Sequence, residues 1–112
     1  MTFTDLERDL IAWFVCQGEA ALARQLQAAS PTSREYTGAG LFLYLAVPEP
    51  ARMPLPTGLL SPIPGPQITA PSLPNGGGSL LFHSDGVVSF LEVYTYTDPL
   101  PEDLAGYRLN AA

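Results

Sequence analysis

The sequence is poor in charge and contains no lysine, although it is 112 residues long. Charged residues make up only 14% of the chain, and eleven acidic residues against five arginines give a net charge of −6. A protein that binds phosphate backbones needs clustered cations to displace counterions. These arginines are instead spread from Arg8 to Arg108. We therefore expect no nucleic-acid partner.

Thiol and imidazole groups are almost absent, because the chain has one cysteine, Cys16, and one histidine, His83. A single cysteine can form no disulfide within the chain, and these ligands are too few for a zinc site. We therefore predict no metal site and no cofactor. Cys16 follows Trp13 and Phe14 in a helical pattern. Free cysteine is among the most buried residue types, which favours a buried, inert thiol.

Long apolar runs are missing as well. No segment approaches the ~20 apolar residues of a membrane helix, and the N-terminus lacks the basic start and continuous apolar core of a signal peptide. We expect a cytoplasmic protein with no membrane partner. The length fits one domain, residues 1–112, with a single modest core.

The N-terminal third predicts a helix from about Thr4 to Ala28. Thr4 and Glu7 have the spacing of a capping box, and apolar residues then recur at helical spacing. Gly18 weakens the middle of this segment and is a point at which the helix could break. Ser30-Pro31 ends it, because proline disfavours a helical residue before it.

Two strand signals follow. Leu41–Val47 is a short apolar run bounded by glycine and proline, which favours a central strand buried on both faces. Asp85-Gly86 separates two further apolar runs and predicts a tight hairpin. A two-residue loop places His83 opposite Val88, whereas a three-residue loop places Phe82 opposite Val88.

Alternation divides the second hairpin strand into two faces. One face holds an aromatic row interrupted by a carboxylate, which either packs structurally or forms a polar binding strip. The members of this row are Val88, Phe90, Glu92, Tyr94 and Tyr96, and the opposite face holds Val87, Ser89, Leu91, Val93 and Thr95.

Residues 48–78 contain nine of the twelve prolines and a run of three glycines. Proline removes hydrogen-bond donors, so this segment predicts neither a continuous helix nor a central strand. Only Gln67–Ala70 has a strand-like pattern. The segment either covers one side of the sheet or serves as a docking segment. The whole pattern indicates an α+β fold: the N-terminal helix packed on a mainly antiparallel sheet of about four strands, with a long Pro/Gly-rich connection.

Two segments carry a resemblance. The motifs Arg34-Glu35-Tyr36-Thr37-Gly38-Ala39-Gly40 and Asp85-Gly86…Leu91-Glu92-Val93-Tyr94-Thr95-Tyr96 resemble those of a group of small uncharacterised bacterial proteins with R-E-x-T-G-x-G and D-G-x-x-x-x-L-E-x-Y-T-Y segments. The chain departs from the group at Leu41, often aromatic there, and at Val93, often glycine. The resemblance implies an α+β domain with its signature on strands. It implies no activity, because none is known for the group.

No nucleophile and base are placed together by the sequence. His83 and Ser84 are adjacent on a strand and point to opposite faces, so we predict no catalytic residue. The sequence favours a non-enzymatic binding or protein-interaction domain, acting as a homodimer or on another protein. The alternative is a small ligand-binding or hydrolase-like domain with a polar site under the proline-rich segment. The candidate binding residues are Arg34, Glu35, Tyr36, His83, Glu92, Tyr94 and Tyr96.

Overall fold

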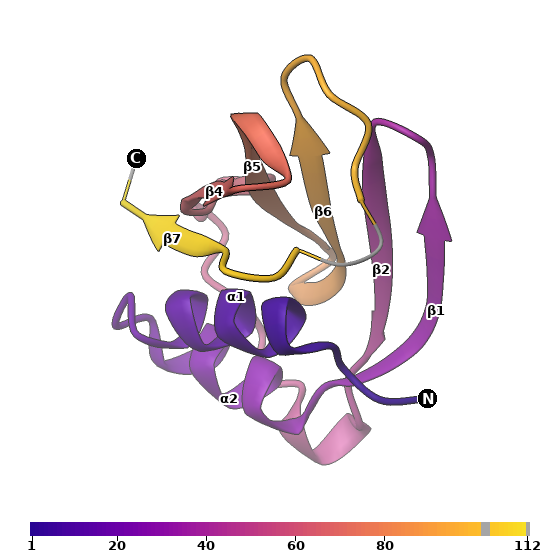
Figure 1. Ribbon diagram of the computed structural model, residues 1–112. Coiled ribbons are helices and arrows are strands. Elements are labelled where there is room, and N and C mark those ends of the chain that lie inside the picture. Colours follow the sequence, from indigo (N-terminus) through magenta and orange to yellow (C-terminus); the bar gives the residue numbers. More distant parts are fainter. Residues whose placement is uncertain (102–103, 112) are drawn as a thin grey trace.

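The computed structural model describes residues 1–101 and 104–111 and has the α+β architecture that the sequence predicts (Figure 1). The helices are α1 (Asp5–Val15), α2 (Ala20–Ala28) and the 3₁₀ turn η1 (Glu49–Ala51). The strands are β1 (Ser30–Tyr36), β2 (Gly40–Ala46), β3 (Ile63–Pro64), β4 (Gln67–Ala70), β5 (Leu73–Ser84), β6 (Val87–Thr95) and β7 (Arg108–Asn110). Within these described ranges, no helix is long and apolar enough to cross a membrane.

The predicted break at Gly18 is confirmed, and two helices replace one. Thr4 caps α1, since its hydroxyl accepts from Glu7 N–H at 3.2 Å and Glu7 accepts from Thr4 N–H at 2.9 Å. Gly18 adopts a φ of +94° between the helices, a conformation in which glycine has no Cβ penalty. The expected burial of Cys16 is wrong, because it lies at the end of α1, past the buried stripe, and is exposed.

Over the residues that the structure describes, the sheet has seven antiparallel strands, so the predicted number of about four is too small. The strand order is β1-β2-β6-β5-β4-β7, with β3 paired to β5. The strand-like pattern of Gln67–Ala70 is confirmed as β4, but the Pro/Gly-rich segment also contributes β3 and the first half of β5, which the prediction missed. Its run of three glycines, residues 76–78, lies inside β5, where Gly78 leaves room for the Tyr94 ring of β6.

Strand β2 is buried on one face only, which corrects the prediction of burial on both. Leu41, Leu43 and Leu45 are buried, whereas Phe42 is half-buried and Tyr44 is 38% exposed. The strand lies between β1 and β6, so it is an interior strand of the sheet, one position from the edge. An antiparallel sheet can leave its second face open, which a continuous apolar run does not reveal.

The β5–β6 hairpin has the predicted tight turn at Asp85-Gly86, with positive φ values of 53° and 79°. Next to the turn, His83 pairs with Val88, as a two-residue loop requires. A bulge between Phe82 and His83 then shifts the register, so that neither predicted register holds along the whole hairpin. The same bulge brings Val88 into the core with Leu91 and Val93 and so breaks the predicted division of faces.

One cluster of buried apolar side chains forms the core. It includes Leu10 and Phe14 of α1, Leu22 and Leu26 of α2, and inward leucines of β2, β5 and β6. The two helices lie side by side, below the strands as drawn in Figure 1. We call the side of the sheet that carries Leu43, Leu81 and Leu91 the leucine face.

Candidate functional site

The side of the sheet opposite the leucine face carries an apolar group of its own. Leu43, Leu91 and Leu81 form one row across the sheet, and the next row consists of Tyr44, Phe90 and Phe82. Because successive residues of a strand point to opposite faces, the second row points away from the core. We call this side the aromatic face and define it by Phe42, Tyr44, Leu80, Phe82 and Phe90.

The aromatic rings contact one another around Phe90. The Phe82 and Phe90 rings are stacked, with centroids 4.4 Å apart and an interplanar angle of 15°. Phe42 meets Phe90 edge-on at 5.8 Å, and Tyr44 lies at 5.7 Å from Phe90. Among the described residues, neither the core cluster nor the side chains packed against it include any of these rings. The aromatic face is therefore a cluster separate from the core.

Two carboxylates lie in the same face as these rings. Glu35 of β1 pairs with Phe42, and Phe42 pairs with Glu92 of β6, so the ring lies between two acidic positions. Neighbouring strands are ~4.8 Å apart, which separates the two carboxylate-bearing strands by about 10 Å. Glu92 is half-buried and Glu35 is exposed. None of the described residues gives Glu92 a hydrogen bond or an ion pair from a side chain.

Arg34 lies on the other side of β1, away from Glu35. It pairs with Leu43 of the leucine face, and its guanidinium donates to both oxygens of Glu7, at 2.6 Å each. Glu7 is fully buried. This hydrogen bonding to the Glu7 carboxylate raises the pKa of Arg34 above its ordinary value. Arg34 is the only arginine of β1, β2, β5 and β6, so these strands place no arginine on the aromatic face.

Tyr94 and Tyr96 extend the aromatic face beyond Glu92. The Tyr94 ring lies over Gly78, where a Cβ would collide with it, and its centroid is 5.7 Å from that of Tyr96. The Tyr96 hydroxyl donates to Gln67 of β4. The pKa of Tyr94 is raised, first by burial, then by its hydrogen bond with Tyr96, and least by the charge of Glu92. Tyr94 therefore supports the glycine-rich strand and also lies near the Glu92 carboxylate.

His83 lies apart from the other candidate residues, at the hairpin end. Its Nε2 is 2.6 Å from the Leu60 carbonyl oxygen, and its backbone N–H donates to the Ser61 hydroxyl at 3.2 Å. It borders a cavity of about 440 Å³ between the hairpin turn and the proline-rich segment, lined by Pro54, Leu55, Pro56, Thr57, His83, Ser84, Asp85 and Gly86. The structure thus brings Glu35, Glu92, Tyr94 and Tyr96 onto one face but separates them from Arg34, Tyr36 and His83.

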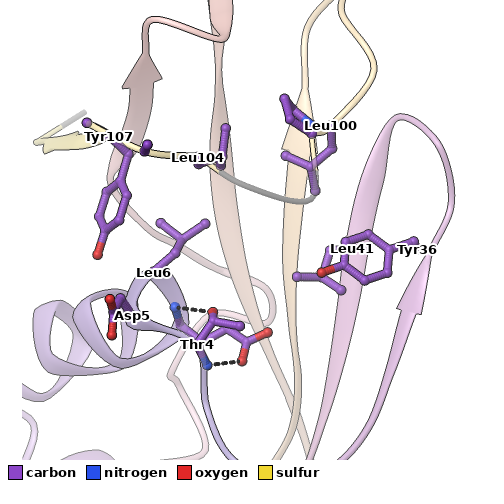
Figure 2. A pocket seen from close by; sticks show the side chains of 12 residues that line it. Thr4, Asp5, Leu6, Tyr36, Leu41, Leu100, Leu104 and Tyr107 are labelled. Atoms are coloured by element: carbon purple, nitrogen blue, oxygen red, sulfur yellow. Dashed lines mark hydrogen bonds between the residues drawn. The ribbon is translucent and has the colours of Figure 1, made fainter.

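Tyr36 borders a second cavity, of about 360 Å³, beside the N-terminus of α1 (Figure 2). In Figure 2, Leu6 points into it from α1, and Leu100 and Leu104 approach from the C-terminal segment. The capping box borders this cavity: the Thr4 hydroxyl accepts a hydrogen bond from the Glu7 N–H, and the Glu7 carboxylate accepts one from the Thr4 N–H. Tyr107 donates to Asp9, and burial, more than this bond, raises its pKa to about 12. Thr4, Glu7 and Tyr107 thus use their polar groups in hydrogen bonds within the protein.

Sequence reasoning placed Phe90 in an aromatic row of the second hairpin strand but did not single out the other residues of the aromatic face. The alternation of leucine with aromatic residues in Leu41-Phe42-Leu43-Tyr44 was the available signal, since the two classes fall on opposite faces of a strand. Gln25 was also missed. Its buried amide donates to Met53 and Gly86 carbonyls at 2.8 Å and accepts from Val88 N–H at 2.9 Å, and no local pattern marks it.

In the part of the chain that the structure describes, no group of three His, Cys, Asp or Glu residues is placed to hold a metal ion. Comparison with family models, with curated proteins and with solved structures gives no match for this chain.

Proposed function

We propose that the protein is a non-enzymatic interaction domain that binds another protein through the aromatic face. The observation that carries this proposal is the ring cluster of Phe42, Tyr44, Phe82 and Phe90, which is separate from the core. Contiguous exposed apolar patches with a polar border are typical of interaction sites. Aromatic side chains supply much of the binding energy at such sites.

The arrangement of the layers supports the same proposal. We infer that α1 and α2 pack on the leucine face, because their buried residues share one cluster with Leu43, Leu81 and Leu91. In that arrangement both helices occupy one side of the sheet. The aromatic face, with Tyr44 38% exposed, is then the side left for a partner.

A second candidate function is the binding of a small molecule in the cavity beside His83. The cavity lies where the proline-rich segment meets the hairpin turn, and its volume of about 440 Å³ is within the usual range for ligand sites. This candidate predicts that a stabilising compound found by thermal shift loses its effect in His83→Ala. A compound that stabilises both proteins equally would count against this cavity.

Site-specific photo-crosslinking in the source cells tests the interaction function. A benzophenone amino acid replaces Tyr44 on the aromatic face or, as the control, the exposed Ala12 of α1. We expect a discrete adduct with another protein from position 44 and none from position 12. The adduct should disappear when Phe82→Ser is added, because the partner loses a central contact. No adduct at position 44, or the same adducts from both positions, would contradict the proposal.

A further inference from the structure

We propose that the partner presents an arginine whose guanidinium binds over the Phe42 ring, between Glu35 and Glu92. This inference rests on the proposed interaction function and adds the chemistry of the partner. Phe42 is paired with both glutamates across neighbouring strands. An aromatic face flanked by two acidic groups attracts a cation through the ring quadrupole and through charge together.

The surroundings of Glu92 support the binding of an arginine at this position. Glu92 is half-buried among Phe42, Leu80, Phe90 and Tyr94, and none of the described residues supplies it with a donor from a side chain. A carboxylate partly removed from water is stabilised by a charged donor more than an exposed one is. Guanidinium suits this position better than ammonium, because it is planar, weakly hydrated and able to stack on a ring while donating sideways to carboxylates.

Charge also argues against a second copy of the chain as the occupant. A face-to-face dimer would bring Glu35 and Glu92 of one chain towards the same residues of its partner. The strands β1, β2, β5 and β6 contribute no arginine to this face that could compensate, since Arg34 is bound to Glu7. Like charges brought together across an interface oppose association. The net charge of −6 favours a cationic partner further.

The test uses a synthetic nine-residue peptide of alternating arginine and leucine with terminal glycines. The control peptide carries citrulline, an uncharged analogue of arginine, in place of each arginine. Both are titrated into ¹⁵N-labelled protein at physiological ionic strength. We expect the arginine peptide to shift amide signals of β1, β2 and β6, and Glu92→Gln to weaken its binding about three- to ten-fold. Glu35→Gln should act in the same direction.

Glu49→Gln is the matched control, because it removes the same charge from the exposed 3₁₀ turn η1. Equal weakening by Glu49→Gln and Glu92→Gln would overturn the inference, since attraction to net charge would then explain binding. The arginine and citrulline peptides could instead bind equally well to the wild type and not at all to Phe82→Ser. That result would overturn the arginine inference but would leave the proposed interaction function intact. If neither peptide binds and no adduct forms at position 44, both the arginine inference and the proposed interaction function are contradicted.

Discussion

Glu7 and Arg34 are joined by the most buried ion pair that the described residues form. Glu7 is fully buried, and Arg34 keeps 18% of its side chain exposed. The same glutamate completes the capping box with Thr4. Its carboxylate therefore caps the start of α1 and also links α1 to β1 through the ion pair with Arg34. The sequence indicated the capping box, because both partners are three residues apart. The bond to Arg34 spans 27 residues, and no local pattern specifies such a pairing.

Replacing Glu7 by Gln should destabilise the protein by about 2–3 kcal/mol, because it leaves the Arg34 charge without its partner. The free energy of unfolding in urea measures this. Asp5→Asn, in the same helical turn but exposed, should cost less than about 1 kcal/mol. The double variant Glu7→Gln/Arg34→Met should regain part of the loss, and a double variant as unstable as the sum of both single changes would contradict the pairing.

Tyr107 should make stability fall in strongly alkaline solution. Its pKa rises in the folded state from 10.0 to about 12, chiefly through burial. Folding therefore favours the neutral phenol. This stabilisation is complete below pH 10 and is lost as the pH rises through about 12. We expect the loss of unfolding free energy between pH 9 and pH 11.5 to be smaller in Tyr107→Phe than in the wild type. An identical pH dependence of both proteins would contradict this account.

At the scale of the elements, the sequence predicted the features that depend on local backbone conformation. It missed the features that depend on contacts between segments far apart in the chain. Gly18 divided the helices and Asp85-Gly86 made the turn, since both need only backbone freedom. Residues 73–78 form the first half of β5, where they pair with β4 and β6 and where Tyr94 of β6 packs over Gly78. A segment with proline and three consecutive glycines gives no strand signal by itself.

Gln25 should prove to be the buried link between α2 and the hairpin turn. Gln25→Leu leaves the Val88 N–H and the Met53 and Gly86 carbonyls without their partner. The expected cost is about 2–3 kcal/mol of unfolding free energy, since buried unsatisfied groups are expensive. The exposed Gln27 of α2 is the matched control, and Gln27→Leu should change stability little. Faster hydrogen exchange at Val88 in Gln25→Leu alone would identify the lost bond as the cause.

Gly77 should be harder to replace than its neighbour Gly78 in β5. A Cβ at Gly77 would collide with the Tyr94 backbone carbonyl, whereas at Gly78 it would meet the movable end of the Tyr94 side chain. Gly77→Ala should therefore cost about 1–3 kcal/mol, and more than Gly78→Ala. Gly58→Ala, where no atom lies within 4 Å of the added carbon, serves as the control in the same denaturation experiment. A smaller cost at Gly77 than at Gly58 would be inconsistent with this geometry.

At the scale of the whole molecule, the sequence predicted the α+β class but not the division between core and open surface. The aromatic row that includes Phe90, Glu92 and Tyr94 was recognised on one strand, but its neighbours Phe42 and Phe82 were assigned to no face. Their placement depends on strand order and on the bulged register, which connect residues far apart in the chain. The candidate set consequently mixed Glu35 and Glu92 with residues that lie elsewhere.

We propose that the aromatic face binds other protein surfaces and that the charges of Glu35 and Glu92 restrict it to a cationic partner. Light scattering across a concentration series tests this on the wild type, on Glu35→Gln/Glu92→Gln, and on the control Asp5→Asn/Glu49→Gln, which removes as much charge elsewhere. We predict the mass of one chain for the wild type and the control. The mass of the face variant should rise with concentration. A stable wild-type dimer, or a face variant that stays monomeric at every concentration, would contradict the account.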